Sequence, residues 1–126
     1  LESFEQIVEK VSCCLVKGGD FVFSVEHPVF TAYGSQEWYY DETGKILHFP
    51  VDNYFFEGHR QASFLGENVS KYHKTLTTYL NGLIQAGFEL TGVVEPQPSE
   101  HLLQTVEGME NELRRPMMLI ISARKK

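Results

Sequence analysis

The sequence lacks the features of secreted, membrane-bound and nucleic-acid-binding proteins. No apolar run approaches the roughly 20 residues that span a bilayer, and no signal peptide is visible. The 126 residues carry a formal net charge of -6, whereas a nucleic-acid partner requires a basic face. We therefore expect neither a membrane nor a nucleic acid as partner, and we expect one soluble domain or part of one.

The sequence also lacks the motifs of metal sites and of nucleophilic catalysis. Its five histidines have no H-x-x-x-H spacing, and no C-x-x-C or G-x-S-x-G motif occurs. We therefore predict no metal site and identify no catalytic residue. The two cysteines, Cys13 and Cys14, are adjacent and cannot cross-link distant segments. We interpret them as small core residues of a reduced, cytoplasmic protein.

A further absence concerns glycine. The ten glycines are scattered, and neither G-x-G-x-x-G nor G-x-G-x-G occurs. Such motifs let the backbone approach a phosphate or a nucleotide cofactor at the N-terminus of a helix. Residues 1–126 therefore contain no recognisable site of this kind.

Residues 17–28, K-G-G-D-F-V-F-S-V-E-H-P, form the most informative stretch. The apolar residues before it recur at steps of three and four, which predicts an amphipathic helix. These residues are Leu1, Phe4, Ile7, Val8, Val11 and Leu15. We expect Gly18 and Gly19 to end the helix, because glycine accepts the positive φ that a helix C-terminus requires.

A strand is predicted directly after these glycines. The apolar, β-branched and aromatic run over 21–25 is typical of a strand that is covered on both faces, and Pro28 cannot continue its ladder. Ligands of open α/β sheets lie outside the carboxyl ends of the strands. Glu26 and His27 are therefore candidate substrate-binding residues, as an anion for a cationic substrate and as a proton acceptor. The alternative is that both are polar loop residues.

Residues 29–60 depart from the regular alternation of helix and strand and are predicted to be an insertion. Residues 38–40 and 46–49 indicate a β-hairpin in which Gly44 takes the left-handed turn position. An insertion at this place would lie above the strand ends. Two interpretations stay open: a lid over the substrate, with Trp38 in contact with it, or a hairpin whose aromatic residues only pack against the sheet.

The pattern over 75–86 predicts a helix that Thr75 caps and Gly87 ends. Tyr72 and His73 precede it and are further candidates for the substrate pocket. The alternative is a structural tyrosine and a solvent-facing histidine, and we expect Lys74 to be a solvated charge. The other expected elements are a connector with some strand character at 63–71, strands at 88–95 and 117–123, short helical turns between them from Ser99 onward, and a solvated end at 124–126.

Several of these segments together resemble one protein family. They are residues 17–28, Y-H-K-T-L-T-T-Y-L-N-G-L-I-Q-A-G-F at 72–88, E-P at 95–96 and R-R-P-M-M-L-I-I-S-A at 114–123. They are similar to the fifth strand, a following helix and the last two strands of class I S-adenosylmethionine-dependent methyltransferases of the small-molecule type. The resemblance covers essentially the whole chain but only the second half of the family's domain.

The resemblance implies an α/β fold, the C-terminal half of a Rossmann-like doubly wound sheet with helices and an inserted β-hairpin. The sheet would have three core strands, with 21–25 beside 117–123, 88–95 on the far edge, and the last strand antiparallel to the other two. The edge of the 21–25 strand would be free and apolar, and such edges recruit another chain. We therefore expect a homodimer through this edge.

The resemblance also implies a function. The family holds S-adenosylmethionine with a glycine-rich turn that this sequence lacks, and the sequence begins at Leu1 inside a predicted helix. We therefore expect residues 1–126 to be a single partial domain, a fragment of an enzyme that transfers a methyl group to a small-molecule acceptor. The fragment would bind S-adenosylmethionine poorly and be inactive alone.

Such a fragment would contribute the acceptor side of the pocket. The residues expected there are Glu26, His27, Trp38, Tyr72 and His73. The alternative is a self-contained α+β ligand-binding or protein-interaction module, complete at 126 residues and without catalytic activity.

Overall fold

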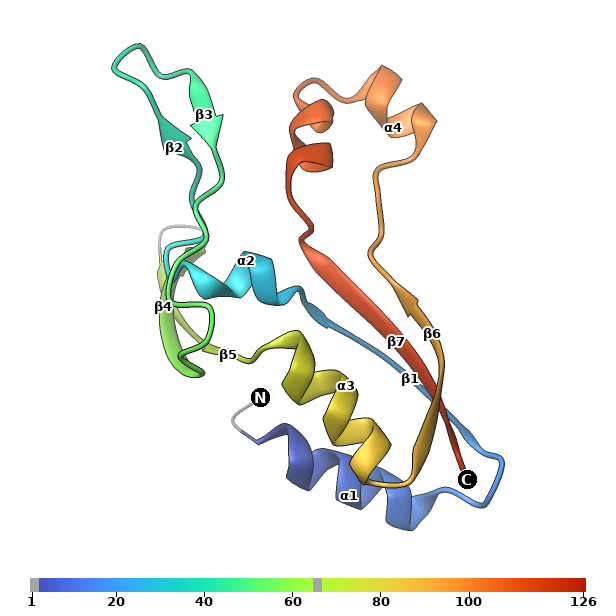
Figure 1. Cartoon of the computed structure of the whole chain (residues 1–126). Coiled ribbons are helices and arrows are strands. Elements are labelled where there is room, and N and C mark those ends of the chain that lie inside the picture. The colour runs from blue at the N-terminus through green and yellow to red at the C-terminus, as the bar shows by residue number, and fades with distance from the viewer. Residues whose placement is uncertain (1–2, 65–66) are drawn as a thin grey trace.

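The computed structural model describes residues 3–64 and 67–126, and its largest sheet has three strands. These are β1 (Asp20–Glu26), β7 (Met118–Lys125) and β6 (Phe88–Val94), in the order β1-β7-β6. Strand β7 runs antiparallel to both neighbours, and Figure 1 shows it between them. The strand order and directions predicted from the sequence are confirmed.

Two helices, α1 (Phe4–Cys14) and α3 (Leu76–Gln85), pack on one face of this sheet. Alternate residues of β7 point into the core, as the period of a strand requires. The core consists of Phe4, Val8, Tyr79, Leu83, Phe88, Leu119, Ile121 and Ala123. On β1, Val22 is 63% exposed. In the part of the chain that the structure describes, β1 is therefore covered on one face, and the prediction of two covered faces is wrong.

The end of α1 differs from the prediction in two respects. Cys13 and Cys14 are exposed, so interpreting them as core residues was wrong; they lie on the helix face turned away from Phe4 and Val8. Lys125, expected in a solvated end, is held instead by the carbonyl groups of Ser12 and, at 2.8 Å, of Leu15. A cation suits this place because carbonyl groups at a helix C-terminus lack partners. Leu1 lies outside the described residues.

The insertion contains the predicted hairpin and one helix that was not predicted. Strands β2 (Tyr39–Tyr40) and β3 (Ile46–His48) pair, and Gly44 between them has a φ of +90°. The Asp41 carboxylate accepts hydrogen bonds from Thr43 and Lys45, and the bond from the Thr43 hydroxyl contributes most to holding the pKa of Asp41 below its ordinary value. Helix α2 (Pro28–Ala32) is short and begins with proline at its first position.

A second hairpin replaces the predicted connector at 63–71. It consists of β4 (Gly58–Phe64) and β5 (Glu67–His73), which pair antiparallel, while residues 65 and 66 lie outside the described part. Helix α4 (Glu100–Thr105) lies in the stretch where helical turns were predicted, and the hydroxyl of its N-cap residue Ser99 accepts the amide hydrogen of Leu102. A 3-10 helix, η1 (Met109–Arg114), follows. Hairpin β2–β3 and the α4–η1 segment both extend from the same end of the three-stranded sheet (Figure 1).

Within residues 3–64 and 67–126, no helix has the length and apolar character needed to cross a membrane.

Candidate functional site

A cavity of about 530 Å³ lies at the carboxyl end of β1, between this strand, α2, β5 and α3. Its lining residues are Ser24, Val25, Glu26, Thr31, Val69, Ser70, Lys71, Tyr72 and Tyr79. We call it the strand-end cavity. It occupies the position at which open α/β sheets bind ligands, and it brings Glu26 and Tyr72 together from segments that are distant in the sequence.

Both carboxylate oxygens of Glu26 already have partners. Oε1 accepts a hydrogen bond from the Lys71 ammonium group at 2.6 Å, and Oε2 accepts one from the Gln36 amide at 2.9 Å. The Glu26 and Lys71 side chains are half-buried, so solvent weakens their attraction less than it would at the surface. Glu26 is therefore half of an ion pair and is not an open carboxylate.

His27 is buried at the start of α2 and uses both ring nitrogens. Nδ1 accepts the amide hydrogen of Val29 at 3.0 Å, which makes His27 the N-cap of the helix. Nε2 lies 2.5 Å from a carboxylate oxygen of Glu95, which follows β6. Because Nδ1 accepts, Nε2 carries the proton and donates to Glu95. His27 thus joins the carboxyl ends of β1 and β6.

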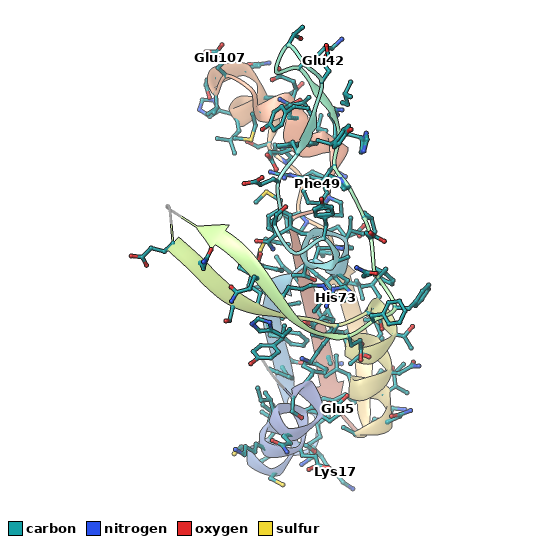
Figure 2. The ribbon with its side chains drawn as sticks, turned by 90° about the vertical axis from the view of Figure 1, so that its left-hand side faces the viewer. Glu5, Lys17, Glu42, Phe49, His73 and Glu107 are labelled. Carbon is teal, nitrogen blue, oxygen red and sulfur yellow. The ribbon has the colours of Figure 1, made fainter. Side chains whose placement is uncertain are left out.

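His73 is fully buried where the β4–β5 hairpin meets the body of the protein (Figure 2). Nε2 donates to the Tyr54 carbonyl at 2.7 Å, and Nδ1 accepts from the Thr31 hydroxyl at 2.7 Å. Burial is the main cause that lowers the pKa of His73, and it outweighs the opposing effect of the Tyr54 carbonyl. The ring is therefore a neutral structural element, and the alternative interpretation of His73 as a solvent-facing histidine is wrong.

Two tyrosines line the strand-end cavity from different elements. Tyr72 on β5 has the Lys74 ammonium group 5.9 Å from its ring centroid, and Lys74 is buried, which contradicts its prediction as a solvated charge. Tyr79 on α3 is only 5% exposed. Burial, with smaller effects from the charges of Glu57 and Glu26, raises the pKa of Tyr79 to about 12. The Tyr79 hydroxyl therefore keeps its proton at neutral pH and can donate a hydrogen bond.

Trp38 lies elsewhere, beside the start of β7. The Arg115 guanidinium group lies 4.3 Å from the centroid of the Trp38 ring, 4.8 Å from Phe49 and 5.1 Å from Phe30. It also donates to the Glu112 carboxylate at 3.1 Å. We call these five residues the Arg115 cluster. A guanidinium group within about 6 Å of an aromatic face is attracted by it. The Arg115 cluster therefore holds the β2–β3 hairpin against the segment before β7 and against α2.

The N-terminus of α3 is closed by a side chain from the segment before β4. Thr75 caps the helix as predicted, accepting the amide hydrogen of Thr78. The Glu57 carboxylate accepts the Thr75 amide hydrogen at 2.8 Å and also a hydrogen bond from the Thr78 hydroxyl. Burial acts to raise the pKa of Glu57, but these hydrogen bonds hold it below its ordinary value. Glu57 is thus a carboxylate at the positive end of a helix.

Two solved structures match this chain over essentially its whole length. A Listeria monocytogenes protein, provisionally assigned as an S-adenosylmethionine-dependent methyltransferase, is 53% identical, with a TM-score of 0.93 over 100% of this chain. An S-adenosylmethionine-dependent methyltransferase from Mesorhizobium loti is 37% identical, with a TM-score of 0.87 over 99% of this chain. The chain has a methyltransferase fold. The Rossmann-like α/β architecture and the family resemblance predicted from the sequence are thereby confirmed.

The matched region is about half of each similar protein. It covers 56% of the Listeria chain and 57% of the Mesorhizobium chain. A protein of unassigned function from Haemophilus influenzae is 28% identical over 130 residues, which are 99% of this chain and 49% of that protein. No family model matches the chain. The chain therefore spans about half the length of the curated relative and of the methyltransferases that it matches.

At α2 and α3, the helices that border the strand-end cavity, the described residues do not fit S-adenosylmethionine as a cofactor held at a helix N-terminus. At α2, Pro28 has no N–H group and the Val29 amide donates to His27. At α3, the Thr75 amide donates to Glu57. The β1–α2 and β5–α3 connections therefore bond these two amides within the protein, and neither connection carries a glycine-rich turn. Among the residues described, no group of three His, Cys, Asp or Glu side chains is placed to hold a metal ion.

Of the predicted site residues, Glu26 and Tyr72 line the strand-end cavity, whereas the other three do not. His27 and His73 support the segments beside it, and Trp38 belongs to the Arg115 cluster.

Sequence reasoning missed Lys71 and Tyr79 as lining residues of the strand-end cavity. Tyr79 lies in the helix predicted over 75–86, and that pattern does not show which of its residues face a cavity. Lys71 lay in the segment interpreted as a connector, so its strand position and direction could not be foreseen.

Proposed function

We propose that this chain is the acceptor-binding half of an S-adenosylmethionine-dependent methyltransferase that acts on a small molecule. The observation that carries the proposal is the match to the Listeria protein, 53% identical over the whole chain at a TM-score of 0.93. The strand-end cavity supports it, because its position and its volume of about 530 Å³ suit a small molecule. The match covers about half of each methyltransferase, so the activity of the whole protein is part of the proposal.

The residues of this chain would act by holding the acceptor. Methyl transfer is a displacement at carbon, so its rate depends on near-attack geometry between donor and acceptor. Glu26, Lys71, Tyr72 and Tyr79 offer polar groups on three sides of the strand-end cavity. His27 would keep α2 and the end of β1 in place as a positioning residue.

The 126 residues alone are expected to be inactive. Neither the β1–α2 nor the β5–α3 connection, which border the strand-end cavity, offers S-adenosylmethionine a free helix N-terminus. Isothermal titration of S-adenosylmethionine into the 126-residue chain should therefore give no saturable heat.

The test is to express the complete reading frame that contains this chain and to compare it with the 126-residue chain. The complete product should bind S-adenosylmethionine and transfer a labelled methyl group to members of a small-molecule panel. The 126-residue chain should do neither.

A reading frame that starts at or next to Leu1, or a complete product that does not bind S-adenosylmethionine, would contradict the proposal. The protein would then be a self-contained α+β ligand-binding or protein-interaction module. Binding of S-adenosylmethionine by the 126 residues would contradict only the expected inactivity of this half.

A further inference from the structure

Among the described residues that line the strand-end cavity, Glu26 carries the one carboxylate, and its charge is already balanced by Lys71. Glu26 receives the Lys71 ammonium group on one oxygen and the Gln36 amide on the other, at 2.6 and 2.9 Å. A cationic ligand bonded to a remaining lone pair of Glu26 would lie next to the Lys71 ammonium group, and it could relieve this repulsion only by displacing Lys71. Displacement would leave the Lys71 ammonium group half-buried without its partner and next to a second positive charge. The cavity is therefore poorly suited to a cation.

Hydrogen-bond donors, in contrast, remain available in the same cavity. Lys71 has three N–H groups, and in the part of the chain that the structure describes its ammonium group makes one hydrogen bond, to Glu26. Its side chain is 21% exposed and lines the cavity. The hydroxyl groups of Tyr72 and Tyr79 bond to no other described residue of the protein. The Tyr79 hydroxyl keeps its proton, because its pKa is raised to about 12.

We propose that the strand-end cavity recognises a small molecule through a carboxylate group, with Lys71 and the hydroxyl of Tyr79 as the donors. The carboxylate would bind the unused N–H groups of Lys71 while Glu26 keeps its ion pair, so that no buried charge loses a partner. The apolar surfaces of Val25, Val69 and Tyr72 offer contacts to a flat apolar body. This inference rests on the proposed function and names the acceptor class as a carboxylate-bearing, ring-sized molecule.

The test uses two probes of similar size and opposite charge, benzoate and benzylamine. Each is titrated into the isotope-labelled 126-residue chain, and amide chemical shifts are followed by NMR. Benzoate should produce saturable shift changes at the backbone amides of residues 24–26, 69–72 and 79, and it should bind more tightly than benzylamine.

Two substitutions distinguish the donors from the carboxylate. Lys71→Met should weaken benzoate binding by about tenfold or more, because it removes a charged donor but keeps an apolar stem. Glu26→Gln should retain or tighten benzoate binding, because the ammonium group loses its competing anion. Lys10→Met, on an exposed position of α1, is the matched control and should leave the affinity unchanged. Circular dichroism melting curves verify that each variant is folded.

Three outcomes would overturn the inference. In the first, benzoate causes no saturable chemical-shift changes at the cavity. In the second, the chain binds benzylamine more tightly than benzoate, and Glu26→Gln abolishes this preference. In the third, Lys71→Met and Lys10→Met change the affinity for benzoate equally. The proposed function fails separately. If benzoate binds but the complete product transfers no methyl group, the carboxylate site stands and the proposed methyltransferase activity fails. If the complete product methylates only cationic acceptors, the methyltransferase activity stands and the carboxylate site fails.

Discussion

At position 73 an imidazole ring lies with none of its surface exposed, between the Thr31 hydroxyl and the Tyr54 carbonyl. Burial lowers its pKa below the ordinary value of 6.5, and the charges of Arg60 and Lys74 act in the same direction. Glu57 acts against them. Protonation therefore favours the unfolded state. The contribution of His73 to stability is complete above pH 6.5 and is lost as the pH falls below that value.

We predict that the free energy of unfolding falls as the pH is lowered from about 8 to about 5, by about 1.4 kcal/mol for each unit by which the pKa of His73 is lowered. Urea denaturation at a series of pH values measures this slope. The His73→Asn variant should be less stable overall, and its free energy of unfolding should depend less on pH. The His101→Asn variant, changed at an exposed position, should keep the original dependence on pH. An unchanged slope in His73→Asn would show that another group causes the acid sensitivity.

The site residues illustrate what a linear sequence can and cannot reveal. Glu26 was predictable because it ends an apolar strand, and strand ends in open sheets bind ligands. The burial of His73 was not predictable, because its partners Thr31 and Tyr54 come from segments that are distant in the sequence. The same holds for the ion pair of Glu26, whose partner Lys71 is 45 residues away along the chain.

Among the elements, those with a strong local pattern were predicted and those without one were missed. Helix α3 has apolar residues at helical spacing, a threonine cap and a terminal glycine. Helix α2 has only five residues, too few to show a period. Strand β4, G-H-R-Q-A-S-F, is largely polar and shows no clear alternation. Its pairing with β5 arises from tertiary structure, which can override local propensity.

The β2–β3 hairpin depends on the Arg115 cluster more than on its own short ladder. Two short strands are at best marginally stable by themselves. Arg115 lies against Trp38, Phe49 and Phe30, and Arg114 donates to the Leu47 carbonyl at 2.8 Å. These contacts connect the hairpin to η1 and the start of β7.

We predict that Arg115→Ala loosens this hairpin and destabilises the protein by about 2 kcal/mol, through the loss of stacked contacts on three rings. Trp38 is the single tryptophan of the chain, so its fluorescence reports on the hairpin directly. Its emission should shift to longer wavelength in Arg115→Ala and stay unchanged in Arg124→Ala, which removes an exposed ion pair with Asp20. Identical spectra for both variants would show that Arg115 does not hold the hairpin.

At the scale of the whole molecule, the sheet has a free edge along β1. In the described part of the chain, β1 pairs only with β7, and Val22 beside this edge is 63% exposed. An unpaired, apolar strand edge is a template for pairing with another strand. We therefore propose that the 126-residue chain forms a homodimer through β1.

Light scattering over a roughly hundredfold range of concentration should show a mass that rises from monomer to dimer. Val22→Lys should lower the dimer fraction because it places a charge beside the edge. Val94→Lys, on the opposite outer strand β6, should not. A monomeric mass at every concentration would rule out this dimer.

Strand β1 lies near the beginning of the described chain, yet the only described strand that it pairs with is β7, with Asp20 opposite Arg124. The C-terminal end of α1 is likewise held by Lys125. During synthesis on the ribosome, the edge of β1 that pairs with β7 therefore stays unpaired until residues 118–125 emerge. Contacts this distant in sequence slow folding, and exposed strand edges invite aggregation meanwhile. This edge of β1 is therefore expected to need protection by chaperones until residues 118–125 emerge.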